Sequence, residues 1–237
     1  MTRCLDKLLQ VQESLIKDLE EPPARPSTVL GLLELDPEEG RRHTSRDAQR
    51  VRILAAMVSA TAERGFVDVT VGDIVARAGV SRTTFYELFD GKLDCYLAAF
   101  DVLTDELTAT LATSFASAVG DPVQAAFEAF FATLEAWPAA SKFCLVDVYA
   151  AGPDAVSRRI DRHGHFAEVL ARIHQRLLDS RATVRPIEPF DLLVVVSGVS
   201  GMVTNHVAVN GVDGLSALVE PTVRFVRSCM GVDTRDQ

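Results

Sequence analysis

The fold of this chain is decided by the stretch Thr70–Phe89, TVGDIVARAGVSRTTFYELF. It predicts two short helices joined by a tight turn at Gly79, because glycine readily takes the left-handed conformation that ends a helix. Thr70 and Ser81 stand where an N-cap hydroxyl accepts a hydrogen bond from the free amides of the helix that follows. A short helix braced by another, with polar donors at its leading end, is how proteins place side chains in the major groove of DNA.

Apolar residues at helical spacing give each predicted helix one buried face. They are Val71, Ile74, Val75 and Ala78 in the first helix, and Phe85, Leu88 and Phe89 in the second. The polar side chains Arg82, Thr83, Thr84 and Tyr86 are left on the other side. The plainer alternative is a helical hairpin with a solvated polar face, and the flanking sequence argues against it.

Those flanks carry a resemblance to the TetR family of bacterial transcriptional repressors, over residues 50–100. A first helix ends in ERGF at residues 63–66, and the motif IVARAGVSRTTFYELF follows at 74–89. An N-cap at Asp90 and a lysine, Lys92, then open a long helix. The chain departs from the family pattern at Val75, where a small alanine is usual, and at Leu93, where an acidic residue is usual.

The resemblance implies an all-α fold with an N-terminal helix-turn-helix DNA-binding domain and a C-terminal helical domain for ligand binding and dimerisation. We expect an extension with an amphipathic helix and a proline-rich linker at 1–40, the DNA-binding domain at 41–92, and the helical domain at 93–237. The extension is either a solvated tail or a helix that packs on its own subunit or the other one. Helical periodicity and Pro or Gly breaks predict helices near 47–64, 90–118, 122–136, 153–178, 190–209 and up to about 230. A short apolar segment at 139–150 lies between two such breaks.

The charge distribution fits a DNA-binding segment in an otherwise acidic protein. The 237 residues carry a net charge of −9, but residues 41–100 hold nine basic and seven acidic residues and are the only net-positive segment of the three. Phosphate contacts are local because salt screens charges beyond about 8–10 Å. The four cysteines form no CxxC pair, and no signal-peptide pattern is present, which favours a reducing cytoplasm. The most apolar run, 192–203, is shorter than the roughly 20 residues needed to span a bilayer.

The expected DNA contacts follow from side-chain chemistry and the resemblance together. Arg82 can donate two parallel hydrogen bonds to guanine. The threonines Thr83 and Thr84, beside the capping Ser81, can touch base edges or phosphates. Phosphate contacts are expected from four further residues: Arg46, Thr70, Tyr86 and Lys92. One subunit offers few contacts, so a homodimer on palindromic double-stranded operator DNA is implied.

Small residues predict the dimer interface, and large apolar residues predict a pocket. Small side chains let helices approach closely, and they recur at Ser197, Gly201, Thr204 and Ala208. The same stripe could instead pack within the chain. A mostly apolar pocket for a small apolar or amphipathic ligand is expected in the middle helices. Its candidate residues are Phe127, Phe130, Phe131, Trp137, Phe143, Tyr149, His165, Phe166, Met202, Asn205 and His206.

No catalytic or cofactor pattern stands out. His163, His165 and His174 lack neighbouring cysteine ligands, so solvated histidines are favoured over a metal site. No nucleophile elbow, phosphate loop or paired-carboxylate pattern is present. We therefore expect a ligand-responsive repressor in the cytoplasm, with no catalytic residue, cofactor or membrane partner. The alternative is a small-molecule-binding protein or enzyme that has kept a vestigial DNA-binding motif.

Overall fold

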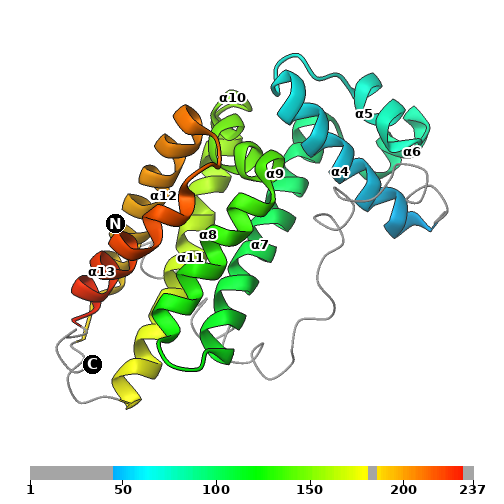
Figure 1. Cartoon of the computed structure of the whole chain (residues 1–237). Helices are drawn as coiled ribbons and strands as arrows, with labels where there is room; N and C mark the ends of the chain where they lie inside the picture. The colour runs from blue at the N-terminus through cyan, green and yellow to red at the C-terminus, as the bar shows by residue number, and fades with distance from the viewer. Residues whose placement is uncertain (1–44, 181–185, 232–237) are drawn as a thin grey trace.

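The computed structural model describes residues 45–180 and 186–231, and within these ranges it is helical with no strand. The all-α prediction is confirmed. Figure 1 shows a small group of helices, α4 to α6, at one end of a larger helical bundle, with α7 joining the two. The predicted extension at 1–40 and its boundary lie outside the described residues.

Three helices form the smaller part: α4 (Arg46–Arg64), α5 (Val71–Ala78) and α6 (Arg82–Leu88). Each begins at a predicted or fitting N-cap, since the side chains of Ser45, Thr70 and Ser81 each accept a backbone amide hydrogen bond. The core of this part is made by fully buried side chains: Ile53, Leu54, Met57, Ile74 and Phe85.

The long helix α7 (Lys92–Ser117) belongs to both parts of the molecule. Cys95, Tyr96 and Phe100 in its first half pack in the same core as α4 to α6, whereas Leu111 and Phe115 lie in the core of the bundle. The first core therefore crosses the predicted domain boundary at 92/93. The N-cap expected at Asp90 is wrong, because the helix is capped by Gly91 and has no side-chain cap.

The bundle consists of α7 and the elements that follow it. They are α8 (Pro122–Ala136), α9 (Pro138–Lys142), the π-helix η1 (Phe143–Asp147), α10 (Val148–Ala150), α11 (Pro153–Ser180), α12 (Pro189–Asn210), the 3₁₀ turn η2 (Leu215–Leu218) and α13 (Val219–Met230). The short apolar segment at 139–150 forms three short helical pieces with a π-helical centre. π-Helical turns are rare overall, but those that occur are often at functional sites. The π-helix η1 contacts α4, α7 and α12.

Helix α12 is long and apolar enough, by length and composition alone, to cross a membrane, with 22 residues and a mean hydropathy of 1.7. The apolar run 192–203 is itself shorter than a bilayer span, but the helix that contains it extends from Pro189 to Asn210. The same test is passed by core helices of soluble proteins, so it is weak evidence. In this chain α12 packs against α11, and its residues Leu192, Val195 and Val203 are buried in the core of the bundle.

Candidate functional site

The first helix of the helix-turn-helix is held at its start by a reciprocal cap. The Thr70 hydroxyl accepts a hydrogen bond from the Asp73 amide at 3.2 Å, and the Asp73 carboxylate accepts one from the Thr70 amide at 2.8 Å. The hydroxyl also donates to the same carboxylate at 2.6 Å. These bonds from Thr70, with the nearby Arg64 guanidinium, lower the pKa of Asp73 to about 2. The cap therefore stays charged and formed at neutral pH.

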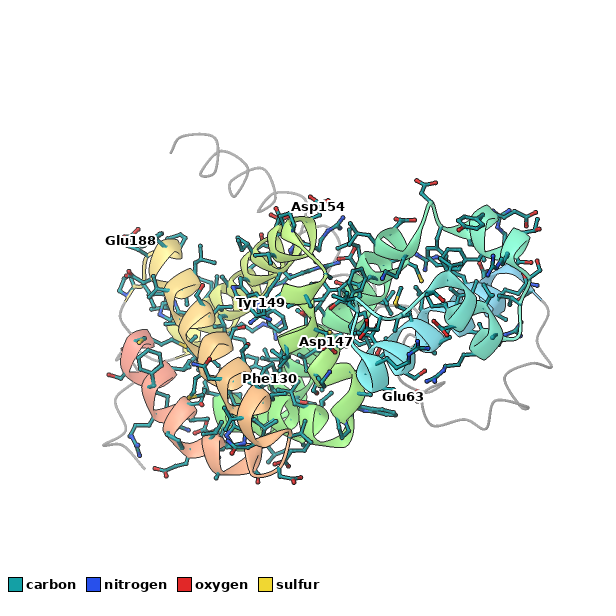
Figure 2. All side chains as sticks on the ribbon, turned by 90° about the horizontal axis from the view of Figure 1, so that it is seen from above. Glu63, Phe130, Asp147, Tyr149, Asp154 and Glu188 are labelled. Carbon is teal, nitrogen blue, oxygen red and sulfur yellow. The ribbon has the colours of Figure 1, made fainter. Side chains whose placement is uncertain are left out.

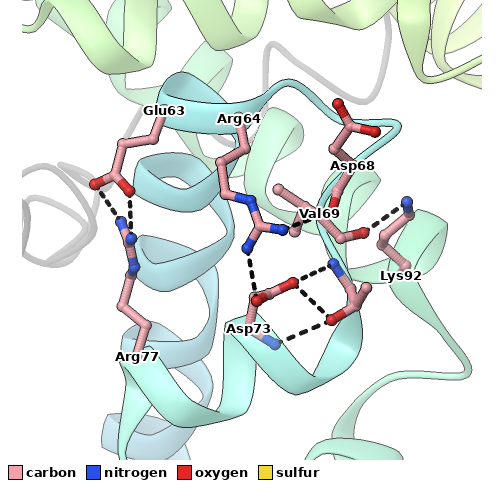
Figure 3. Close-up of polar contacts among 8 residues, drawn as sticks. Glu63, Arg64, Asp68, Val69, Asp73, Arg77 and Lys92 are labelled. Carbon is pink, nitrogen blue, oxygen red and sulfur yellow. Dashed lines mark hydrogen bonds and ion pairs between the residues drawn. The ribbon is translucent and has the colours of Figure 1, made fainter.

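Two ion pairs fix α5 against α4 (Figure 3). Arg64 Nη1 lies 2.7 Å from Asp73 Oδ1, so the cap of α5 is tied to the last turn of α4. Arg77 Nη1 donates to Glu63 Oε1 at 2.7 Å near the other end of α5. Each pair is partly exposed and contributes little stability on its own. Together they set the orientation of the helix that supports α6.

Helix α6 presents its polar side chains to solvent. Gly79 takes the predicted left-handed conformation, with φ 64°, and the Thr84 amide donates to Ser81 Oγ at 2.9 Å to start the helix. Phe85 is completely buried, which anchors the opposite face. Arg82, Thr83 and Tyr86 are exposed, and the Arg82 guanidinium lies beside Gly72 in the first turn of α5. These three side chains are free to meet the edges and phosphates of a DNA duplex.

Lys92 does not fit the phosphate contact expected of it. Its ammonium donates to the carbonyl oxygens of Phe66 and Val69, both at 2.8 Å, and to that of Val67 at 3.3 Å. An ammonium has three N–H donors, so all are committed inside the protein. Figure 3 shows the side chain reaching back to Val69. Lys92 holds the α4–α5 link onto α7, which is a structural role.

Arg46 is exposed at the start of α4, and its Nη2 donates to the Glu87 carbonyl of α6 at 2.9 Å. This contact ties the first and last helices of the smaller part together. A guanidinium has five N–H donors, so this contact is compatible with the expected phosphate contact by the exposed side chain.

A second candidate site is a cavity of about 90 Å³ enclosed by α7, α8, η1, α11 and α12. Most of its wall is apolar, with Leu107, Leu111, Phe127, Phe130, Phe166 and Leu170 among the lining residues. Figure 2 shows Phe130 in the bundle, away from Glu63 at the smaller part. Lining residues on α11 run from Arg159 to Leu170, a distance of about 16 Å at 1.5 Å per residue.

One end of this cavity is polar. Arg159, only 6% exposed, donates to the Cys144 carbonyl at 3.0 Å, to Ser200 Oγ at 2.7 Å and to Thr204 Oγ1 at 2.8 Å. His163 Nε2 lies 3.0 Å from the same Ser200 hydroxyl. Burial, with the neighbouring Arg159 charge, lowers the pKa of His163 to about 4, so the imidazole is neutral at pH 7.

The other arginines of this face of α11 are paired with acids of α7. Arg162, which also lines the cavity, pairs with both Asp101 and Asp105. Arg158 pairs with Asp101 at 2.9 Å and does not line the cavity. The ion pairs join Asp101 to Arg158 and Asp105 to Arg162. Because both partners advance by four residues, α7 and α11 lie side by side and run parallel.

Comparison with known proteins finds a family match over the helix-turn-helix segment. Residues 53–99 match the family model described as bacterial regulatory proteins, tetR family. This segment of the chain, which contains the helix-turn-helix, is thus similar to the DNA-binding part of TetR-family regulators. A curated relative, the HTH-type transcriptional activator FasR of Mycolicibacterium smegmatis, is 31% identical over 107 residues, which cover 43% of this chain. This chain spans about half the length of that relative, 49%.

Solved structures of bacterial regulators share the fold over about three quarters of this chain. The fatty acid degradation regulator FadR from Bacillus halodurans superposes with a TM-score of 0.66 at 17% identity, over 75% of this chain and 94% of that one. The regulator FadR from Bacillus subtilis, in complex with stearoyl-CoA, gives 0.65 at 16% identity, over 77% and 98%. At these identities the likeness shows the fold alone.

The cavity contains only part of the predicted ligand site. Phe127, Phe130 and Phe166 line it. Eight predicted residues do not: Phe131, Trp137, Phe143, Tyr149, His165, Met202, Asn205 and His206. Phe131 and Phe143 are completely buried core residues, and Phe143 stacks on Tyr96 with ring centroids 4.1 Å apart. Trp137 lies at the break between α8 and α9, and Tyr149 lies in α10. His165, Met202, Asn205 and His206 lie on faces of α11 and α12 other than the ones that line the cavity.

The functional residues missed by sequence reasoning are the polar ones. Arg159 and Ser200 are not among the predicted ligand-binding residues, and the sequence favours a solvated His163, whereas all three line the cavity. His174 is 4% exposed, so it is not solvated either. Spacing offered one usable signal, since Arg159, His163, Phe166 and Leu170 recur every three or four residues on one face of α11.

The predicted dimer residues separate into two groups. Ser197, Gly201 and Ala208 lie on the exposed face of α12. Thr204 points inward instead, because its hydroxyl accepts the hydrogen bond from Arg159. Exposed apolar side chains accompany the first group on α12 and α13: Phe190, Val194, Met202, Val209 and Phe225.

Proposed function

We propose that this protein is a DNA-binding transcriptional regulator whose affinity for its operator is controlled by a small amphipathic ligand in the helical cavity. The observation that best supports this proposal is the position of helix α7. It packs with α4 to α6 at one end and lines the cavity at the other. The exposed Arg82, Thr83 and Tyr86 supply the DNA contacts. The FasR relative, an activator, and the FadR structures support the class of regulator.

The cavity favours a ligand with an extended apolar part. Its wall is mostly aliphatic and aromatic and follows about 16 Å of helix, which suits an acyl chain better than a compact ring system. The similar fold of FadR from Bacillus subtilis, which holds stearoyl-CoA, supports the same ligand class. Repression in the cytoplasm, with release of DNA on ligand binding, is the proposed default.

A homodimer is proposed to present two α6 helices to a palindromic operator, one DNA turn or about 34–36 Å apart. A Cβ added at Gly198 or Gly201 would meet no atom within 4 Å among the described residues. Packing within the chain therefore does not require these glycines. Their place among exposed apolar side chains on α12 and α13 favours close approach by a second copy.

A contact path links the cavity to the DNA-binding helices. Cys144, whose carbonyl is bound by Arg159, follows Phe143 in η1. The Phe143 carbonyl accepts a hydrogen bond from the Tyr96 hydroxyl at 2.7 Å, and the Tyr96 ring contacts Phe66 edge-to-face at 5.0 Å. Ligand binding that shifts η1 or α7 would change the spacing of the two α6 helices and so the DNA-binding population.

Fluorescence anisotropy with the DNA upstream of the protein's own gene tests this function. We expect specific binding that Arg82→Ala reduces and that Arg176→Ala, an exposed change in the bundle, leaves intact. A long-chain acyl compound should release the DNA. The alternative, an enzyme or binding protein with a vestigial motif, is supported instead by ligand binding without any preference of the protein for that DNA over random sequence.

A further inference from the structure

A positive charge lies in the wall of the cavity with no acidic partner. Arg159 is 6% exposed, and its three hydrogen bonds all go to neutral oxygens, on Cys144, Ser200 and Thr204. Among the residues that the structure describes, no carboxylate forms an ion pair with it. Buried charges are normally paired, since removing them from water is costly.

The neighbouring groups do not supply the missing negative charge. Arg162, one turn along α11, is neutralised by Asp101 and Asp105. His163 is neutral at pH 7 because of its lowered pKa, and it adds no charge of its own. At the polar end of the cavity the Arg159 guanidinium thus has only neutral hydrogen-bond partners, beside hydroxyl and imidazole groups that can donate or accept.

The positions of these groups give the cavity a direction. Arg159 and Cys144 lie at the end nearest the DNA-binding helices, where η1 contacts α4. Leu111 and Leu170 lie at the other end, eleven residues further along α7 from Phe100 and along α11 from Arg159. A ligand that fits both ends has one polar head and one apolar tail.

From this arrangement we infer that the cavity binds a monoanionic amphiphile, a long-chain carboxylate, with its head on Arg159 and its chain along Phe130, Phe166 and Leu170. The inference rests on the proposed ligand-binding function and adds the charge of the head group and the residue that selects it. A carboxylate matches the planar guanidinium and its single charge. A thioester or an alcohol leaves that charge uncompensated.

The test is isothermal titration calorimetry of the full-length protein with dodecanoate, dodecanol, methyl dodecanoate and dodecanoyl-CoA at pH 7. We expect dodecanoate to bind at least about tenfold more tightly than the alcohol and the ester, from one charge-assisted hydrogen-bonded pair. This first comparison uses the wild-type protein and does not depend on any variant folding. Equal affinities for acid, alcohol and ester would overturn the inference while leaving the apolar pocket intact.

Two variants assign the preference to a residue. Arg159→Met should lower the affinity for dodecanoate to the affinity for dodecanol. Arg159→Lys, which keeps the positive charge, should retain part of the preference for dodecanoate over dodecanol. Arg158→Met is the matched control, because Arg158 lies one residue away, is paired with Asp101 and does not line the cavity. A preference that survives in Arg159→Met overturns the inference, as does a thioester that binds more tightly than the acid independently of Arg159.

Failure of the underlying function has a different signature. If none of the four compounds binds the wild-type protein, the proposed acyl-ligand pocket and this inference both fall. If alcohol and acid bind equally and both release DNA, only the head-group assignment falls. Circular dichroism of each variant confirms that the helical fold is retained before affinities are compared.

Discussion

At the scale of single residues, side-chain type predicted chemistry well but direction poorly. Lysine and arginine in a net-positive segment are reasonable phosphate contacts, yet Lys92 turns inward whereas Arg82 stays exposed. The difference lies in the backbone around each residue. The link between α4 and α5 leaves carbonyls without helical partners, and the Lys92 ammonium reaches three of them.

The variant Lys92→Met should therefore act on stability. Losing an ammonium bound to three carbonyls and lying 4.3 Å from the Phe66 ring centroid is expected to cost about 2 kcal/mol of folding free energy. Thermal unfolding should show a lower Tm, while the folded variant keeps its preference for operator over random DNA. An unchanged Tm together with weaker binding to both DNAs would restore the phosphate contact instead.

The lowered pKa of His163 predicts a pH dependence. A histidine whose folded pKa is about 4, against an ordinary 6.5, leaves the unfolded chain binding more protons between these values. Its contribution to stability is thus complete above pH 6.5 and declines as the pH falls towards 4. Urea unfolding at pH 7 and pH 5 should show this decline in the wild type and less of it in His163→Gln. The Asp73 carboxyl, with a pKa near 2, adds its own loss only below about pH 4.

At the scale of elements, helix positions followed the sequence pattern closely. Helices α4, α5, α8, α11 and α12 begin and end within about three residues of the predicted limits, because caps, prolines and glycines act locally. The π-helix η1 was not predicted, since no local signal in FCLVD distinguishes a wider turn from an α-turn. Its position between Arg159 and Tyr96 makes it the element that connects the cavity with α4.

Removing one hydrogen bond should weaken that connection. Tyr96→Phe keeps the ring stacked on Phe143 but loses the bond to its carbonyl, at a cost of about 1 kcal/mol. We expect DNA binding to persist while a saturating ligand releases less of the DNA. Tyr149→Phe is the control, because Tyr149 lies half-exposed beside Arg159 and has the same change of chemistry. Full release in Tyr96→Phe would exclude this route of coupling.

At the scale of the whole molecule, the exposed face of α12 and α13 is the feature that a single chain does not explain. Gly198 and Gly201 lie open, and Val209 is 80% exposed, on a face that should pack against a copy of itself. Dimerisation would also determine whether both α6 helices reach successive turns of DNA.

A long charged side chain on this face should separate the subunits. Gly201→Arg is expected to give a monomer by analytical ultracentrifugation at micromolar concentration and to lose high-affinity operator binding. The control, Ala116→Arg, places the same side chain on an exposed position of α7 outside this face. A Gly201→Arg protein that remains dimeric would show that the dimer interface lies on another face of the molecule.

The sequence by itself determined the helix-turn-helix, the all-α class and most helix limits. Capping at Thr70 and Ser81, the turn at Gly79 and the burial of Phe85 are local consequences of residue type and spacing. Tertiary structure alone decided which side chains share a space. Arg159, Cys144 and Ser200 come from three different elements, and only helix packing brings them to one cavity. Packing likewise turns Lys92, Phe143 and Thr204 away from the DNA, the ligand and the second subunit that their residue types predicted for them. The apolar periodicity of a helix shows which of its faces is buried, whereas the element that covers this face depends on long-range packing.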